Sequence, residues 1–295
     1  MNKLSYWWQR LDVEPSKTEY ACEFMKEKNF LWKVVSLPCF TCINGEYIEI
    51  PQNRVVARSD DMKPIYVVKK QYKLMDNDEC FQITDLFKKA YEGSKFVSCG
   101  DILNKKKSYI TMLLKKTKLL NDDFLAYITV ANGFDGRNAV NCALTLIREK
   151  DHAVFQLSDE HHKRIWTMGR MNIKSKFERI QKEVEEYIKY AQKTVDELNE
   201  REIDLNGTLN PLFDLDWKKS KCVNLHMAEQ KEWIREIYIK NGGKSLYHLY
   251  MAISSYYCNY RNFRNGKLGD DMRFDFAMCG YFYELHNYIN YILKK

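Results

Sequence analysis

Two β-hairpin patterns in the first half of the chain constrain its fold more than any other feature. Residues 124–131 and 139–147 are runs of aliphatic, aromatic and β-branched side chains, a composition typical of paired strands. The segment between them, Asn132-Gly133-Phe134-Asp135-Gly136, supplies two glycines for the positive-φ positions of a tight connection. We therefore expect this hairpin at the centre of an antiparallel sheet. Its tip, Asp135-Gly136-Arg137, is either a functional loop or the ordinary composition of a turn.

The other hairpin pattern precedes this one. Residues 31–37, 47–50, 54–57 and 65–68 are rich in strand-forming side chains, and Ile43-Asn44-Gly45-Glu46 has the composition of a hairpin turn. The segment therefore predicts a second set of antiparallel strands.

Helical signals flank these strands. Residues 17–28 place apolar side chains on one helical face after Ser16, and Asp76 is followed by Glu79 at the spacing of a capping box. The second signal predicts a helix that runs to about residue 91 and is ended by Gly93. Its expected inner face consists of Phe81, Leu86, Phe87 and Ala90.

A long helix is predicted from residue 173 onward, because apolar residues recur there at alternating steps of three and four with one skipped position. The seam is formed by Ile173, Phe177, Ile180, Val184, Tyr187, Ala191 and Leu198. Between residues 171 and 201 seven basic residues balance seven acidic ones, as on a solvated helix with one narrow apolar stripe. Either the seam packs against another chain, with the helix projecting as an arm, or it docks on the chain's own sheet.

The C-terminal third predicts three helices, over residues 223–240, 244–263 and 272–295. Nine tyrosines lie between residues 247 and 291, and tyrosine is favoured at interfaces because it joins a large apolar body to a polar tip. They belong either to a self-association or partner surface or to a core. Together with the helix seam, the residues predicted for an oligomer or partner surface are Phe177, Ile180, Val184, Tyr187, Tyr256, Tyr257, Tyr260, Cys279 and Tyr281.

The formal net charge of +7 is mild for 295 residues, so only its distribution can be informative. Six lysines cluster without an acidic residue among them: Lys105, Lys106, Lys107, Lys115, Lys116 and Lys118. Such a cluster is the footprint of a nucleic-acid or acidic-partner patch. The alternative is two lysine-edged turns that flank one buried strand.

The inventory of chemical motifs predicts no catalytic residue, cofactor or metal. No phosphate-binding loop, dinucleotide fingerprint or nucleophile elbow occurs, and the six histidines lack metalloprotease or triad spacing. Cys39 and Cys42 have no second ligand pair, so we expect structural thiols there. The nine cysteines and the lack of a long apolar run predict a cytoplasmic protein with free thiols and no membrane contact.

Several segments resemble a known family. Residues 58–68 (Arg-Ser-Asp-Asp-Met-Lys-Pro-Ile-Tyr-Val-Val), residues 127–139 (Tyr-Ile-Thr-Val-Ala-Asn-Gly-Phe-Asp-Gly-Arg-Asn-Ala) and the Leu-Ile-Arg of residues 146–148 are similar to phage and plasmid proteins that carry domain of unknown function 932. The resemblance implies an origin in a mobile genetic element. The chain's size and layout are also similar to those of phage inhibitors of Gabija, a bacterial defence system built from a nuclease and a helicase-like partner.

These patterns together predict an α+β protein with an N-terminal antiparallel sheet and flanking helices (residues 1–165), a long amphipathic helical arm (166–205) and a C-terminal helical association region (206–295). The expected function is that of a non-enzymatic phage anti-defence protein. It would act as a homo-oligomer that binds a Gabija-like nuclease complex in the host cytoplasm and denies it DNA. The alternative is a protein that binds and anneals single-stranded DNA in phage recombination, using the lysine cluster.

Overall fold

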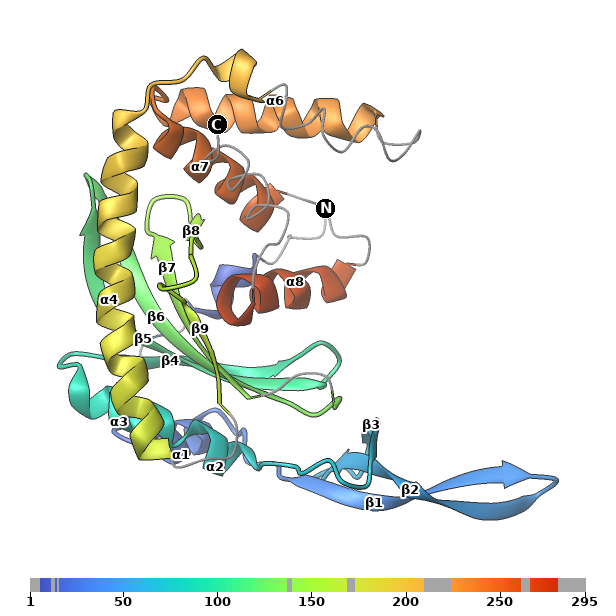
Figure 1. Cartoon of the computed structure of the whole chain (residues 1–295). Helices are drawn as coiled ribbons and strands as arrows, with labels where there is room; N and C mark the ends of the chain where they lie inside the picture. Colours follow the sequence, from blue (N-terminus) through green and yellow to red (C-terminus); the bar gives the residue numbers. More distant parts are fainter. Residues whose placement is uncertain are drawn as a thin grey trace.

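The computed structural model describes residues 6–11, 14, 16–136, 140–168, 173–209, 224–260 and 266–280. It is an α+β structure with two antiparallel sheets and a set of helices (Figure 1). Within these described residues, no helix is both long and apolar enough to cross a bilayer.

The first sheet is a narrow three-stranded projection, here called the β-arm (residues 34–69). It consists of β1 (Val34–Ile43), β2 (Glu46–Arg58) and β3 (Pro64–Lys69), in the order β1-β2-β3. Asn44 and Gly45 form the β1–β2 turn with φ values of 52° and 86°, which confirms the predicted hairpin turn. The two runs predicted around residues 47–57 are one long strand, because β2 continues through a bulge opposite Pro38–Phe40.

The second sheet is the core of the molecule. Its strands are β4 (Lys95–Ile102), β5 (Lys107–Leu119), β6 (Asp122–Gly133), β7 (Asn141–Arg148), β8 (Val154–Phe155) and β9 (Ile165–Thr167). The order is β4-β5-β6-β7-β8, with β9 also paired to β7. The β6–β7 hairpin is therefore central, as predicted. Of the two turn glycines only Gly136, with φ of 70°, has a positive φ; Gly133 ends β6.

Short helices flank this sheet. α1 (Ala21–Glu27), α2 (Asn77–Phe81) and α3 (Ile83–Ala90) lie at its arm end (Figure 1), whereas η1 (Trp7–Arg10) lies beside Phe274, with the Trp7 and Phe274 ring centroids 6.4 Å apart. The predicted capping box is wrong, because the Asp76 carboxylate accepts a hydrogen bond from Val34 N at 3.3 Å instead of capping its own helix. The single predicted helix is divided at Gln82. As a result Ile83 turns inward with Phe87, while Ala90 is exposed.

The long helix α4 (Ile173–Glu200) runs along one side of the second sheet, from α3 at one end to α7 at the other (Figure 1). Its seam is covered by the chain itself: Ile180, Val184 and Tyr187 are 1%, 0% and 0% exposed. The Tyr187 hydroxyl donates a hydrogen bond to Leu157 O at 2.7 Å. The prediction of a projecting helical arm is therefore wrong, and docking on the chain's own sheet is correct, since the sheet already fills the apolar stripe.

The C-terminal helices are α6 (Asn224–Lys240), α7 (Leu246–Ser255), the π-helix η2 (Tyr256–Tyr260), α8 (Gly266–Phe274) and the π-helix η3 (Asp275–Cys279). They lie against the second sheet and α4, and one continuous apolar core extends from Trp7 to Cys279. The core crosses the boundaries expected at residues 165/166 and 205/206, which remain predictions. The last predicted helix starts earlier than expected, at Gly266, and residues 281–295 lie outside the described ranges.

Candidate protein-interaction surfaces

The tip of the β-arm carries large apolar side chains on both of its faces. Residues paired across two strands share a face. One face therefore holds Phe40, Cys42, Tyr47 and Glu49, and the other holds Thr41, Ile43, Glu46 and Ile48. Tyr47 is 79% exposed, and Phe40 and Ile43 are each 53% exposed. A hairpin that is apolar on both faces and projects from the body is a candidate contact surface for another chain.

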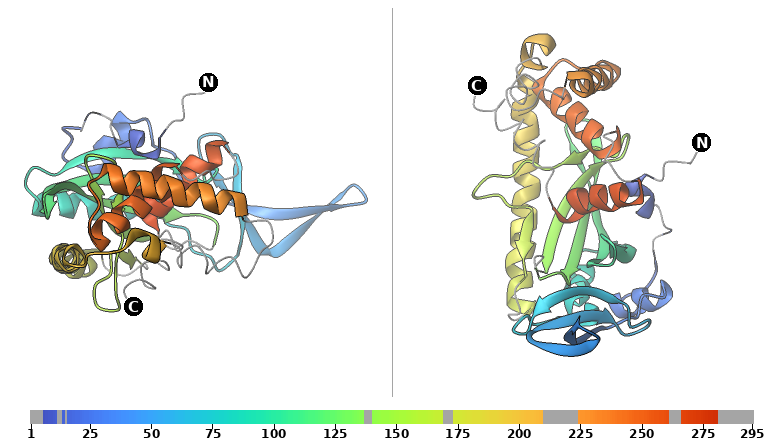
Figure 2. Two further views of the ribbon diagram at one scale, coloured as in Figure 1. Left: turned by 90° about the horizontal axis from the view of Figure 1, so that it is seen from above. Right: turned by 90° about the vertical axis from the view of Figure 1, so that its right-hand side faces the viewer.

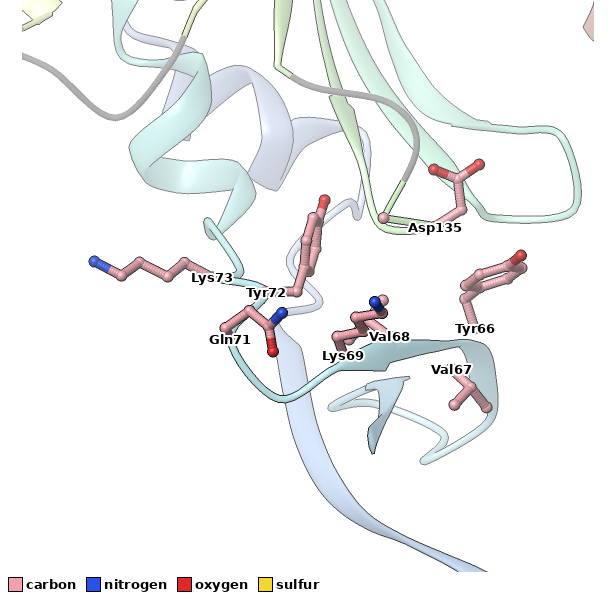
Figure 3. Close-up of a pocket in the computed structure, with 9 residues that line it drawn as sticks. Tyr66, Val67, Val68, Lys69, Gln71, Tyr72, Lys73 and Asp135 are labelled. Atoms are coloured by element: carbon pink, nitrogen blue, oxygen red, sulfur yellow. The ribbon is translucent and has the colours of Figure 1, made fainter. Parts of the chain in front are cut away.

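A groove lies where the β-arm joins the body, and we call it the basal groove. Its volume is about 630 Å³ and it is lined by Tyr66, Val67, Val68, Lys69, Gln71, Tyr72, Lys73, Asp135 and Gly136. Tyr66 and Tyr72 lie on the side that faces Asp135, whereas Val67 points the other way (Figure 3). The Tyr72 hydroxyl donates to Gly133 O at 3.0 Å, which fixes one wall of the groove to the end of β6. The Asp135-Gly136 loop thus forms part of a groove.

The strongest basic feature beside this groove is a segment that the sequence prediction missed. Lys69, Lys70 and Lys73 occur within five residues, and none of them forms an ion pair in the part of the chain that the structure describes. A signal was present in the sequence, namely three lysines around Gln71 and Tyr72. Only the structure shows that no carboxylate neutralises them.

The predicted lysine patch, in contrast, is divided and largely neutralised. Its residues lie toward the two ends of β5, and the strand between Lys107 and Lys118 places these two lysines roughly 36 Å apart. The ion pairs are Lys105–Asp61 at 3.6 Å, Lys107–Asp275 at 2.6 Å, Lys115–Glu185 at 2.8 Å and Lys116–Glu149 at 2.6 Å. Lys106 lies over the Tyr66 ring at 5.3 Å, and Lys118 is exposed. One continuous patch therefore does not form, and the lysine-edged turns are what the structure contains.

Lys107 has a structural role in particular. Its side chain is 5% exposed and meets the Asp275 carboxylate of η3. Burial lowers the pKa of Lys107, but the nearby carboxylate outweighs that effect and holds the pKa above its usual value. The ammonium group is therefore part of the core, with no access to a phosphate.

A second exposed aromatic surface lies on the C-terminal helices, and we call it the C-terminal patch (Trp233 and Tyr260). The two rings stack with centroids 5.2 Å apart. They are 47% and 46% exposed. Tryptophan and tyrosine are enriched among residues that dominate binding energies. This patch and the β-arm lie at opposite ends of the molecule (Figures 1 and 2).

The other residues predicted for a partner surface are placed differently. Phe177, Ile180, Val184, Tyr187, Tyr256, Tyr257 and Cys279 are buried within the chain. Tyr260 alone among the described members is exposed, and Tyr281 lies outside the described residues. For the tyrosines the cause is that their hydroxyls find partners inside this protein, as Tyr250 does with Gln156 N at 2.7 Å, so a tyrosine-rich segment packs as a core.

Within the described residues no group of three or more histidine, cysteine, aspartate or glutamate side chains is placed to hold a metal ion. His162 stacks on Tyr190, with ring centroids 4.4 Å apart, and its Nδ1 lies 3.1 Å from the Asp159 carboxylate. Cys39 is buried and Cys42 is exposed, so the two thiols of the Cys-x-x-Cys segment point to different environments.

The fold defines the chain as an α+β protein, and its surface carries two separated groups of exposed apolar side chains. A family model for a domain of unknown function, DUF932, matches residues 64–275, more than two thirds of the chain, and the chain belongs to this family. The match begins at β3, so β1 and β2 of the β-arm lie outside it. Neither a curated protein nor a solved structure matches the chain.

Proposed function

We propose that this chain is a non-enzymatic anti-defence protein of phage origin that binds a bacterial antiphage nuclease complex of the Gabija kind and sterically denies it DNA. In this proposal it acts in the host cytoplasm as a homo-oligomer, and its partner is a protein assembly.

The observation that carries the proposal is the presence of two exposed apolar surfaces at opposite ends of one chain. The β-arm tip is one, with Tyr47 79% exposed, and the stacked pair of Trp233 and Tyr260 is the other. One surface alone would serve a simple dimer. Two separated surfaces let each copy contact a target and a further copy at the same time, which is the arrangement that a coating assembly requires.

Occlusion also sets a size requirement. Stable signalling and obligate complexes bury about 2,000 Å² or more, and DNA must be excluded from a nuclease over a comparable area. A hairpin that projects from the body contributes both of its faces to a contact between copies, and paired copies cover a larger area than one chain does. The β-arm therefore suits a protein that covers its target as an assembly.

A second candidate function is single-stranded DNA binding, which Lys69, Lys70 and Lys73 favour because no acidic side chain among the described residues forms an ion pair with them. The tyrosines beside them are poorly placed for base stacking, however. Lys106 already covers the Tyr66 ring at 5.3 Å, and the Tyr72 hydroxyl is held by Gly133 O.

The test is co-purification of the tagged protein from cells that carry a Gabija operon, with nuclease treatment and size-exclusion chromatography at high salt. We expect a stoichiometric complex with the defence nuclease that survives the salt. The double substitution Trp233→Ala and Tyr260→Ala should reduce recovery of the nuclease. The control is Tyr20→Ala, which changes a 45% exposed tyrosine just before α1 and should leave the recovery unchanged. Recovery of nucleic acid alone, lost as salt rises, would refute the proposal and support DNA binding.

A further inference from the structure

Charge is segregated along the β-arm. From residue 40 to residue 53 the chain holds Glu46 and Glu49 and no basic residue. The base of the arm carries Lys69, Lys70 and Lys73. The tip is therefore acidic and the base is basic, while apolar side chains are exposed at both.

These charges are almost entirely unused within the chain. Glu46 and the three basal lysines form no ion pair among the residues that the structure describes. Glu49 has only a 3.6 Å contact with Arg54. The remaining charged groups of the arm are paired locally; Arg58, for example, holds Asp60 at 2.5 Å and lowers its pKa to about 2. The unpaired groups are thus those at the two ends.

The backbone at the base of the arm is also open. β3 is an edge strand of the three-stranded sheet. Lys70 N donates to Gln52 O at 2.7 Å, and because ladder bonds alternate along a strand, the amide groups of Val67 and Lys69 point away from β2. The basal groove, about 630 Å³ in volume, is lined by four consecutive residues of this edge, Tyr66 to Lys69 (Figure 3). It therefore presents both side chains and free backbone donors to an extended segment.

We propose that the β-arms of two copies of this chain pair head to tail, so that the acidic tip of each lies in the basal groove of the other. A two-fold axis makes the two contacts identical, as in most homodimers. The two arms overlap over a short length, the distance from the tip to the base of one arm. Glu46 at the tip precedes Asn53, which pairs with Lys69 at the base, by seven residues, or at most roughly 23 Å of strand. Ile43 and Ile48, exposed in the single chain, are covered by Tyr66 and Tyr72 of the other copy.

A second copy is the occupant that the charges favour. Lys69 and Lys73 outnumber Asp135 among the residues that line the groove, so the groove favours an extended, acidic and apolar segment, and the arm's own tip has all three properties. The pairing occurs without any nuclease and leaves the C-terminal patch free for a target. It rests on the homo-oligomer of the proposed function and specifies its contact, and the two tests stay distinguishable: variants that dimerise normally would refute this pairing alone, whereas failure to recover a nuclease would refute target binding alone.

The test is a charge-swap experiment on the purified full chain, followed by light scattering coupled to size-exclusion chromatography. The tip variant carries Glu46→Lys and Glu49→Lys, and the base variant carries Lys69→Glu, Lys70→Glu and Lys73→Glu. Each variant alone should weaken dimerisation at least tenfold, about 1.4 kcal/mol, because both contacts of its homodimer bring like charges together. An equimolar mixture should restore the dimer, since a heterodimer then has two complementary contacts.

A control matched to the base variant changes three other exposed lysines that form no ion pair among the described residues: Lys26→Glu, Lys95→Glu and Lys118→Glu. Its net charge changes by the same amount as that of the base variant. This control should dimerise like the wild type. Circular dichroism establishes that every variant is folded. A monomeric wild type at tens of micromolar would overturn the proposal, as would variants that dimerise normally or a mixture that fails to recover. If the wild type is monomeric and binds DNA, and the base variant has lost that binding, the groove is instead assigned to nucleic acid.

Discussion

The carboxylate of Asp122 links three parts of the core, and removing it should be strongly destabilising. Asp122 begins β6 and accepts hydrogen bonds from Arg148 of β7 at 3.0 Å and from the Tyr247 hydroxyl of α7 at 2.9 Å. Arg148 is 1% exposed and Tyr247 is 2% exposed. In Asp122→Ala both donors lose this acceptor where water cannot replace it.

The expected magnitude follows from these two donors. A buried donor left unsatisfied costs about 1–3 kcal/mol, with the higher values for charged groups, and removal of one partner of a buried ion pair costs about 3–5 kcal/mol. Arg148 keeps the Asp151 carboxylate at 2.6 Å, which limits its share. We therefore expect the free energy of unfolding to fall by about 3–5 kcal/mol.

The assay is urea-induced unfolding followed by tryptophan fluorescence and circular dichroism. Lys150→Ala is the matched control, because Lys150 contacts the same carboxylate at 2.6 Å but its side chain is 47% exposed; it should lose at most about 1 kcal/mol. A loss for Asp122→Ala that is no larger than that for the control would refute the reasoning.

The pH dependence gives a second readout of the same group. Burial raises the pKa of Asp122, but the hydrogen bond from Lys150 and the charge of Arg148 outweigh it and hold the pKa below its usual value. A carboxyl whose pKa is lower in the folded state stabilises the fold above the unfolded pKa of about 3.9. The stability difference between the wild type and Asp122→Ala should therefore be constant near neutral pH and shrink as the pH falls below about 4.

Three further predictions follow from the same structure. Ile180→Ala, in the buried seam of α4, should lower the free energy of unfolding by about 2–5 kcal/mol in chemical denaturation while the oligomeric state, measured by light scattering, stays that of the wild type; a changed oligomer with unchanged stability would contradict docking on the chain's own sheet. Tyr47→Ser should shift stability by less than about 0.5 kcal/mol because Tyr47 is 79% exposed, and a larger loss in the same assay would mean that the arm tip packs on the body. In mass-spectrometric mapping at neutral pH, iodoacetamide should modify exposed Cys42 well before Cys99, whose pKa is raised to about 12 mainly by burial; equal rates would contradict that burial.

The features that could be predicted from sequence are those set by neighbouring residues. The β6–β7 hairpin and the helix from Ile173 to Glu200 follow from local periodicity and turn composition, and both are present. What covers the helix seam could not be predicted in this way, because the sheet that fills it comes from strands far away in the chain. A heptad stripe has the same pattern whether its partner is another chain or the same one.

The lysine cluster shows the same limit for the candidate sites. The carboxylates that neutralise two of its lysines are 168 residues away for Lys107 and 70 residues away for Lys115. The neighbouring sequence, which contains no acidic residue, therefore gives no sign of these ion pairs. Conversely, Lys69, Lys70 and Lys73 have an acidic residue nearby in the sequence, Asp76, yet it is engaged with Val34 N. Whether a lysine is available depends on tertiary contacts that composition does not reveal.

The partnership of Lys107 with Asp275 also determines when the protein can finish folding. A ribosome adds about 5–20 residues per second, so the 168 residues between the two take roughly 8–34 s to synthesise. Arg10 remains without its partner for longer than Lys107 does, because Asp271 follows Arg10 by 261 residues. Asp271 also accepts a hydrogen bond from Leu103 N. Until then the sheet contains a cation destined for the core without its counter-charge, and its apolar face lacks α7 and α8. The nascent chain therefore stays open, with the apolar hairpin of the β-arm already exposed, until Asp271 and Asp275 have been synthesised.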